Sequence, residues 1–416
     1  MSKQAHIVAR GIDTLVVNGY YTDEQGNPIK QDLEETLWGE LRHLKEAAIA
    51  ESGEIPTRWS FAGQCLHMQP NGGNHGQFPY LLKCPLLTLA VSHGKWNGIA
   101  QVRLSSEYLW GCEGLGAALV EVNELVYEFF NADIYLQLSD TDLCVDIAGW
   151  DELLTLNLRR DFVSRSRKRT IHAEADWAGS VDSTAEYSYG LQPSGFDFSP
   201  RGPMSCTIYD KTREIKKSGK LWMEDVWYTN GWDEDEDPIV IRLEYKYSRE
   251  VIHEITQDGA FHGIESAYDL VDRLEVLWAY AAGQVGGGLD TERPDGWLRC
   301  VVPMEDDSNR SRWPTHPNWV IVQQAFTVPC SVPAQFGKII RKRKEQRNID
   351  KAVESMFGYA TSMAAWEGDE LAELDTDIST FLSRFVERSL LYQKRSMKDF
   401  AAEVRRKRVK LGLQVA

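Results

Sequence analysis

The 416-residue sequence lacks the motifs that would assign several common chemistries. Its seven cysteines form no Cys-x-x-Cys pair, so neither a zinc ribbon nor a redox dithiol is indicated. The nine histidines form no His-x-His metal pair. There is no Gly-Lys-Ser/Thr phosphate loop and no Gly-x-Ser-x-Gly elbow, so the sequence predicts neither ATP binding nor Ser-His-Asp hydrolysis.

Long hydrophobic runs are also missing. No window approaches 18 consecutive apolar residues, so we expect no membrane span and no membrane partner. The N-terminal basic residues are not followed by an apolar segment, which predicts that there is no signal peptide. Widely spaced cysteines, several of them in apolar runs, are typical of buried free thiols, and we therefore expect a cytoplasmic protein.

Charge is distributed unevenly along the chain. The formal net charge is −16, which argues against a uniformly basic nucleic-acid-binding surface. Residues 331–416 nevertheless contain 17 Lys+Arg against 12 Asp+Glu, a net +5, so the remainder carries −21. A basic tail on an acidic body indicates a polyanionic partner.

The hydrophobic pattern predicts groups of strands beside single long helices, without strict βαβ alternation. This pattern favours an α+β fold with a curved, largely antiparallel sheet, packed helices and a C-terminal helical region. We expect an α+β catalytic domain over 1–330, with 1–155 and 180–330 as two loosely repeated halves, and a basic helical region over 331–416. The expected helices are 32–50, 113–130 and 264–282, and the expected strands include 11–21, 79–93, 98–108, 140–152, 204–210 and 239–247.

Polar residues inside apolar strands are the candidates for chemistry. Alternation places Asp146 of "LCVDIAGW" on the face opposite Val145 and Ile147, and "VIRLEYKYSRE" places Arg242, Glu244 and Lys246 together on one face. Such a charged face is either solvated or an active site. The stretch "CTIYDK" adds Tyr209 and Lys211 at the end of another strand.

These side chains together fit one reaction, the attack of a hydroxyl on a phosphate. Asp146 and Glu244 are oxygen ligands of the kind that Mg²⁺ or Mn²⁺ takes. Tyr209 supplies the hydroxyl, which needs activation because the pKa of a free tyrosine is about 10. Lys211 could offset charge on the phosphate, and Arg242 and Lys246 could hold its non-bridging oxygens.

The stretches "CVDIAGWD", "GFDFSPRGPMSCTIYDKTREI" and "RLEYKYSRE" resemble the Rep-trans family. Its members are initiators of rolling-circle plasmid replication and related relaxases of integrative conjugative elements. The resemblance covers roughly residues 10–280. Matched to the family motifs, Asp146 is the strand aspartate, Tyr209 the tyrosine of Ile-Tyr-Asp-Lys, and Glu244 the carboxylate of Arg-x-Glu.

The resemblance implies a metal-dependent endonuclease that cuts one strand at an origin. It leaves a 5′-phosphotyrosyl link and a free 3′-OH. The implied partner is origin DNA, both duplex and single-stranded. A host helicase and a second copy of the chain, in a homodimer, are possible further partners. Tyr187 and Tyr189 precede the same hairpin, so they remain alternative nucleophiles to Tyr209.

Three basic runs are candidates for phosphate contact, although each could be a solvated helix face. Their DNA-binding candidates are Arg165, Arg167, Lys168, Arg169, Lys338, Arg341, Lys342, Arg343, Lys344, Arg405, Arg406, Lys407 and Arg408. Trp222, Trp227 and Trp232 could stack on bases or support the core. A non-catalytic DNA-binding regulator with the same fold is the main alternative function. A carbohydrate-active enzyme, suggested by 14 Trp and many carboxylates, explains neither Tyr209 nor the basic tail.

Overall fold

The computed structural model describes most of the first 341 residues and a few positions beyond them. The described residues are 5–73, 77–94, 98–165, 184–189, 192–257, 261–287, 295–327, 339–341, 356, 387–388, 396, 401–402 and 404–405. The chain divides into two compact units, Met1–Arg343 and Lys344–Ala416. The expected helical character of the C-terminal region lies largely outside the described residues. The helices and strands named in the following paragraphs all belong to the first unit.

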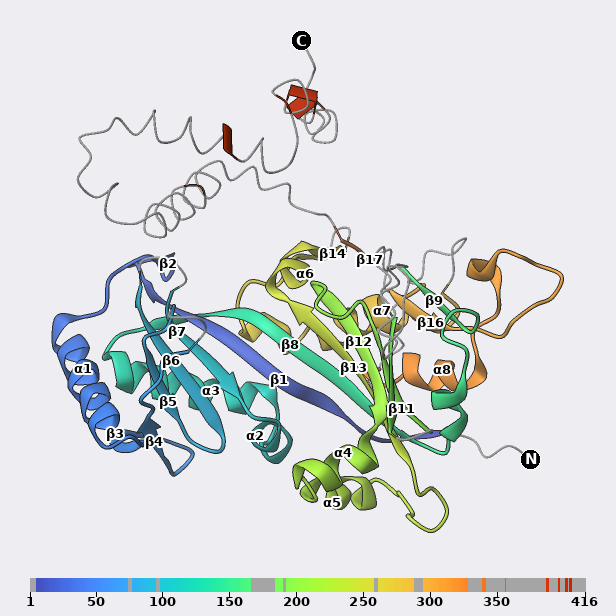
Figure 1. Ribbon diagram of the computed structural model, residues 1–416, viewed down its shortest axis with the longest axis horizontal. Coiled ribbons are helices and arrows are strands. Elements are labelled where there is room, and N and C mark those ends of the chain that lie inside the picture. Colours follow the sequence, from blue (N-terminus) through green and yellow to red (C-terminus); the bar gives the residue numbers. More distant parts are fainter. Residues whose placement is uncertain are drawn as a thin grey trace. The chain divides into compact units, whose positions relative to one another are not determined.

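A large antiparallel sheet organises the first unit, as the sequence predicted (Figure 1). Eleven strands follow one another in the order β10-β11-β12-β13-β8-β1-β7-β6-β5-β4-β3, β2 pairs with β1, and the sheet does not close into a barrel. The strands are β1 (His6–Thr22), β2 (Pro28–Ile29), β3 (Ile55–Phe61), β4 (Gln64–Met68), β5 (Tyr80–Lys83), β6 (Leu87–Gly94), β7 (Gly98–Leu104), β8 (Ile134–Ala148), β10 (Thr184–Tyr189), β11 (Gln192–Phe198), β12 (Met204–Asp210) and β13 (Val240–Ser248). Strand β8 belongs to the predicted half 1–155 and β13 to the half 180–330. Because these two strands pair, both halves contribute to one sheet.

Eight α-helices in the described residues connect and cover these strands. They are α1 (Glu35–Ala50), α2 (Ser106–Gly111), α3 (Leu115–Phe130), α4 (Lys211–Ser218), α5 (Trp222–Thr229), α6 (Arg249–Glu254), α7 (Leu274–Ala282) and α8 (Pro317–Gln323). No helix among the described residues is long and apolar enough to cross a bilayer. The predicted helices 32–50 and 113–130 correspond to α1 and α3. The predicted helix 264–282 is instead a 3₁₀ turn, Tyr268–Leu270, followed by α7.

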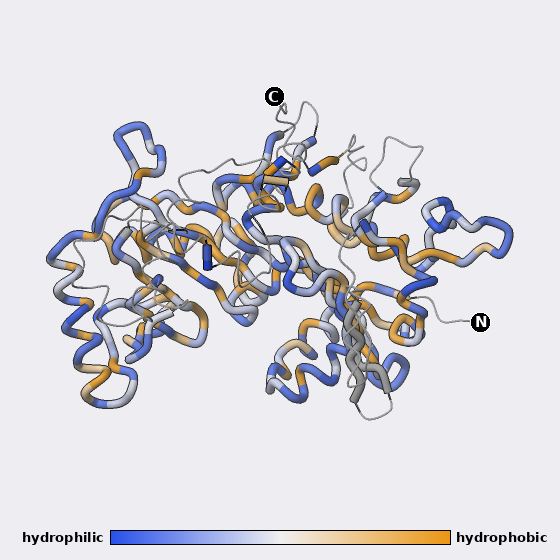
Figure 2. Tube along the Cα trace, turned by 45° about the horizontal axis from the view of Figure 1, so that its top comes forward, coloured by the Kyte–Doolittle hydropathy of each residue, from blue (hydrophilic) through white to orange (hydrophobic). Residues whose placement is uncertain are grey.

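Hydrophobic residues pack on both faces of the central strands, but unequally. The larger core combines alternate residues of β8 and β13, such as Val145 and Leu243, with α1, α3, α7 and α8. A smaller core on the opposite face joins Val8, Ala148 and Val240 to α4 and α5. Hydrophilic and hydrophobic residues consequently alternate along the sheet and its helices (Figure 2). This second face is only partly covered, and it carries the predicted site.

Two small sheets complete the unit. One pairs β9 (Phe162–Ser164) with β16 (Leu298–Cys300), and the other has the order β15-β14-β17, formed by Phe261–His262, Ile255–Gln257 and Ile339–Arg341. Residues 339–341 were expected in the helical C-terminal region, whereas they form a strand paired with β14. The β-branched pair Ile339–Ile340, with Ile339 buried, favours this strand over a basic helix.

Candidate active site

The predicted site residues lie on one face of three neighbouring strands, β12, β13 and β8. Residues directly opposite one another in antiparallel strands share a face, so the registers define three rows. The rows are Tyr209–Arg242–Asp146, Thr207–Glu244–Cys144 and Ser205–Lys246–Asp142. We call these nine residues the polar face. Its exposure rises along β13, because Arg242 is buried, Glu244 is partly exposed and Lys246 is exposed.

Tyr209 lies at the end of the polar face nearest to α4. Its hydroxyl donates to Oε2 of Glu244 at 3.3 Å and accepts from Nζ of Lys211 at 3.4 Å. Lys211 is 2% exposed and also forms an ion pair with Glu214. Burial, followed by the nearby charge of Glu244, raises the pKa of Tyr209 well above its ordinary value. Tyr209 is therefore a neutral phenol placed between a carboxylate and a cation.

Asp210, the residue after Tyr209, is the N-cap of helix α4. Its side chain accepts from the backbone N–H of Arg213 at 3.0 Å and thereby caps α4. The helix begins at Lys211 and ends before Gly219, whose φ of 77° is the left-handed conformation that suits glycine. The capped helix fixes Lys211 beside the tyrosine that precedes it.

Glycine is required at position 195 because β11 approaches Tyr209 closely. Gly195 lies directly opposite Tyr209, and a Cβ built there would lie 2.6 Å from the Ile208 oxygen and 2.7 Å from the Tyr209 Cβ. The backbone register also pairs Gly195 with Tyr187 of β10. The register thus places positions 187 and 209 in one row, on either side of Gly195.

Arg242 and Asp146 form a buried ion pair, and both side chains are 0% exposed. Nε and Nη2 of Arg242 donate to the two oxygens of Asp146 at 2.6 and 2.7 Å, and Nη1 pairs with Asp13. The indole N–H of Trp227 donates to Asp146 at 2.9 Å. A phosphate clamp by Arg242, or a metal bond by Asp146, would require this pair to break. The two residues instead organise the sheet beneath the open part of the polar face.

Two carboxylates lie near Glu244, one on the polar face and one beside it. Asp13, Asp142 and Glu244 come from β1, β8 and β13. Burial, with the neighbouring charges of Asp13 and Asp142, raises the pKa of Glu244 to about 7. Burial also raises the pKa of Asp142 to about 6, against the attraction of Lys246, and its Oδ1 has no hydrogen-bond partner among the described residues. The carboxyl groups of Glu244 and Asp142 are therefore partly protonated near neutral pH.

The two residues of the predicted metal pair, Asp146 and Glu244, have different partners in the structure. Asp146 is committed to Arg242 and Trp227, while Glu244 contacts Tyr209. Within the described ranges, no three His, Cys, Asp or Glu side chains converge closely enough to hold a metal ion. The residues that are present thus fit a fully protein-coordinated metal poorly. Glu244 is partly exposed on the open face.

Sequence reasoning missed three residues of this network, Asp13, Asp142 and Glu214, and the bond from Trp227 to Asp146. Asp142 repeats the two-residue spacing of Cys144 and Asp146, so alternation could have found it. Asp13 could not be found in this way. It is the extra residue of a β-bulge between Ile12 and Thr14, and bulges redirect side chains. The contacts of Glu214 and Trp227 depend on the packing of α4 and α5, two helices that were not predicted from the sequence.

The predicted DNA-binding residues are only partly described. Arg165 is exposed, and its backbone N–H donates to the Trp297 carbonyl. Arg341 is instead held by Glu250 and Glu254. Arg405 is exposed, with a weak bond to the Ala401 carbonyl. The remaining predicted residues, Arg167, Lys168, Arg169, Lys338, Lys342, Arg343, Lys344, Arg406, Lys407 and Arg408, lie outside the described residues.

Of the three tryptophans proposed for base stacking, two are buried. Trp227 is 0% exposed and Trp232 is 4% exposed, with its indole N–H bonded to the Asp237 carbonyl at 2.8 Å. They form the small core under α4 and α5 and cannot stack on a base. Trp222 is partly exposed and keeps that option.

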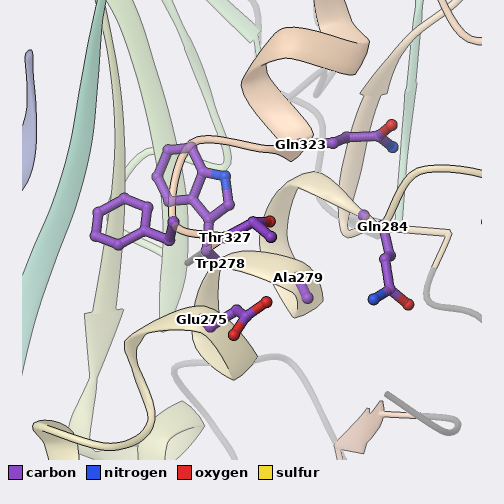
Figure 3. A pocket seen from close by; sticks show the side chains of 8 residues that line it. Glu275, Trp278, Ala279, Gln284, Gln323 and Thr327 are labelled. Atoms are coloured by element: carbon purple, nitrogen blue, oxygen red, sulfur yellow. The ribbon is translucent and has the colours of Figure 1, made fainter. Parts of the chain in front are cut away.

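A small pocket lies away from the polar face, between α7 and α8 (Figure 3). Its lining includes Glu275, Trp278, Gln284 and Gln323. Trp278 and Gln323 are engaged, because they donate to the carbonyls of Val322 and Ala282. Glu275 is the one titratable residue of the lining, and burial raises its pKa. The lining has no second titratable side chain to pair with Glu275, so we assign this pocket no activity.

Comparison with known proteins gives little independent guidance. No family model matches the chain, and no curated protein matches it. Among solved structures, the chain is similar to a rolling circle replication initiator protein from Geobacillus stearothermophilus. The TM-score is 0.36 at 14% identity, and the match covers 77% of this chain and 96% of that chain. A match at this level does not assign a chemistry to this chain.

Proposed function

We propose that this chain nicks one strand of DNA at an origin, as a replication initiator or relaxase, with Tyr209 as the nucleophile. The observation that carries the proposal is the position of the Tyr209 hydroxyl. It lies on a partly open sheet face, between the carboxylate of Glu244 and the ammonium of Lys211. A phenol placed between a proton acceptor and a cation is suited to attack a phosphate.

The attack can be written with the residues that contact Tyr209. Its oxygen bonds to phosphorus while the bond from phosphorus to the 3′ oxygen breaks. The hydroxyl proton passes to Glu244, and the leaving 3′ oxygen takes a proton from water. The products are a 5′-phosphotyrosine and a free 3′-OH. A pKa of about 7 suits Glu244 to accept a proton near neutral pH.

Two lysines could stabilise the charge that develops on the phosphate. Lys211 already lies within 3.4 Å of the Tyr209 oxygen, and its ammonium has three donors. Lys246 is exposed two rows away along the same face. Arg242 contributes indirectly, because it is directly opposite Tyr209 and holds Asp146 and Asp13 beneath the face.

A requirement for Mg²⁺ or Mn²⁺ is a separate part of the proposal. A bound divalent ion would act as a Lewis acid on the phosphate oxygens. Such an ion at Glu244 would lower the pKa of this carboxylate and weaken it as a base. The two roles of Glu244 therefore compete, and no step of the proposed attack passes through a metal. Cleavage measured with EDTA, and then with Mg²⁺ or Mn²⁺ restored, decides between them.

Supercoiled DNA from the element that encodes the chain tests the proposed function. We expect the wild-type protein to convert it to the open-circular form, and the Tyr209→Phe variant to bind it equally well without cutting it. Full nicking by Tyr209→Phe would transfer the role to Tyr187 or Tyr189. Tight, specific binding with no cutting by the wild type would favour the non-catalytic regulator.

A further inference from the structure

Helix α4, which directly follows Tyr209, carries an exposed stripe of cations. Arg213, Lys216 and Lys217 have the i, i+3, i+4 spacing of one helix face, and Lys220 follows Gly219, directly after the helix ends. Arg213, Lys216 and Lys217 are exposed, and Lys220 is partly exposed. We call these four residues the α4 stripe. Other residues separate them along the chain, so the sequence shows no unbroken basic run at this point.

The stripe is a local concentration of positive charge in an acidic protein. Residues 211–222 contain five Lys+Arg and one acidic residue, whereas the whole chain carries −16. Arg213 pairs with the capping Asp210, and Lys220 donates to the Ser106 hydroxyl at 3.1 Å. The helix dipole favours cations in the last turn, where Lys216 and Lys217 lie. It does not account for Arg213 in the first turn or for Lys220 directly after the helix.

The inner side of α4 fixes this stripe relative to the candidate nucleophile. Lys211, Thr212 and Ile215 are buried, and the Thr212 hydroxyl accepts from the backbone N–H of Val240 in β13 at 2.8 Å. At 1.5 Å per residue, Lys217 lies about 9 Å along the axis from Lys211. Figure 1 shows α4 starting where β12 ends. The cations are therefore held close to the residue that contacts Tyr209.

We infer that the α4 stripe binds the backbone phosphates of the single-stranded DNA segment that flanks the cut. This inference rests on the proposed function, because it locates the substrate strand relative to Tyr209. Exposed Lys and Arg side chains recognise phosphates through charge and without reading sequence. The stripe thus supplies affinity and positions the strand, while sequence is read elsewhere.

The residues after the stripe favour a single strand over a duplex. Leu221 is 53% exposed, and Trp222 is partly exposed at the start of α5. Apolar and aromatic surface beside cations is the usual combination in single-strand sites, where bases stack while phosphates contact charge. The acidic first turn of α5, with Glu224 and Asp225, ends the basic surface. The basic surface is therefore confined to α4 and the few residues that follow it.

The affinity of full-length protein for oligo(dT), measured over a range of salt concentrations, tests the charge contact. Each phosphate contact adds about 0.7 to the slope of log K against log salt for a single strand. We expect the double variant Lys216→Ala/Lys217→Ala to bind more weakly at low salt, with a slope lower by roughly 1.4. The matched control is Lys30→Ala/Lys83→Ala, which removes two exposed lysines, one directly after β2 and one in β5. This control should match the wild type.

Cleavage of trimmed oligonucleotides then locates the contact. On a long substrate the α4 double variant should raise KM severalfold and leave kcat within about twofold, because these lysines lie away from the hydroxyl. Removing nucleotides from one side of the cut should raise the wild-type KM to that of the variant, and trimming the other side should not. Equal slopes and equal KM values for variant and wild type would overturn the inference. Loss of duplex affinity alone would assign the stripe to the duplex and also overturn it.

The outcomes keep this inference separate from the proposed function. If the wild type cuts DNA and the α4 variant matches it in every measurement, only the α4 inference fails. If the wild type never cuts, while the slope on oligo(dT) still falls in the α4 variant, the stripe binds single strands but the proposed chemistry fails.

Discussion

At the scale of single residues, the polar face separates buried from accessible charge. Arg242 and Asp146 satisfy each other in the interior, whereas Glu244 and Lys246 remain within reach of a substrate. A buried pair of this kind contributes little net stability when it is intact, but removing one partner leaves an unpaired buried charge. The strand registers thus distinguish residues that shape the site from residues that can act in it.

Loss of Asp146 should destabilise the protein strongly. We expect Asp146→Ala to lower the free energy of unfolding by about 3–5 kcal/mol, because Arg242 is left buried without its main partner. Urea unfolding followed by tryptophan fluorescence measures this. The control is Lys246→Ala on the exposed end of the same face, which should stay within about 0.5 kcal/mol of wild type. Equal, small effects of the two changes would contradict the buried pair.

A methyl group at position 195 should disturb the site from the neighbouring strand. The added Cβ meets backbone at 2.6 Å, so Gly195→Ala must push β11 away from β12 at Tyr209. We expect a loss of about 1–3 kcal/mol of stability and a fall in strand cleavage larger than the fall in oligonucleotide binding. Gly39→Ala in α1 is the control, since nothing lies within 4 Å of its added Cβ. A fully active Gly195→Ala variant would show that β11 can shift without moving Tyr209.

At the scale of secondary-structure elements, α8 contains a titratable cap. Nδ1 of His316 accepts from the backbone N–H of Asn318 at 3.2 Å, and the ring stacks on Trp150. Burial lowers the pKa of His316, against the opposing charges of Glu152 and Asp161. Protonation would remove the acceptor and place a positive charge at a helix N-terminus.

The stability that His316 contributes should therefore be lost in acid. Its folded-state pKa lies below the unfolded value of about 6.5, so the contribution is complete above that pH and declines as pH falls through the folded-state value. His316→Asn keeps a capping acceptor that does not titrate. We expect the thermal midpoint of the wild type, relative to that of His316→Asn, to fall as the pH is lowered below about 6.5. Parallel curves over this range would refute the role of the histidine.

The sequence predicted the elements that have a strong period and missed the short ones. Alternation in β8, β12 and β13 was clear, and it correctly separated the apolar face from the charged face of β13. Helices α4 and α5 were missed because each has eight residues, too short for a clear hydrophobic stripe. The Arg242–Asp146 pair depends on strand register, which a single sequence does not specify. For this reason Arg242 was predicted to contact phosphate and not its neighbour.

At the scale of the whole molecule, the boundary between the two units falls inside the basic tail, after Arg343. Of the 17 Lys+Arg in residues 331–416, four precede Lys344. Residues 344–416 keep 13 Lys+Arg against 12 Asp+Glu, which is nearly neutral. Any contribution of the second unit to DNA binding must therefore come from local clusters such as 405–408.

Truncation after Arg343 tests that contribution while it keeps β17 paired with β14. We expect the shortened chain to bind duplex DNA more weakly and with a flatter salt dependence, because the 405–408 cluster is lost. It should still cut a short single-stranded oligonucleotide, since the polar face and α4 remain. Unchanged duplex affinity and salt slope would show that the second unit does not bind DNA.

The covalent intermediate is the most direct test of the central claim that Tyr209 is the nucleophile. Wild-type protein is incubated with a single-stranded oligonucleotide from its element, denatured, and digested, and the DNA-linked peptide is identified by mass spectrometry. We predict a 5′-phosphate ester on Tyr209 and no adduct with Tyr209→Phe. An adduct on Tyr187 or Tyr189, or one that persists in Tyr209→Phe, would contradict this claim.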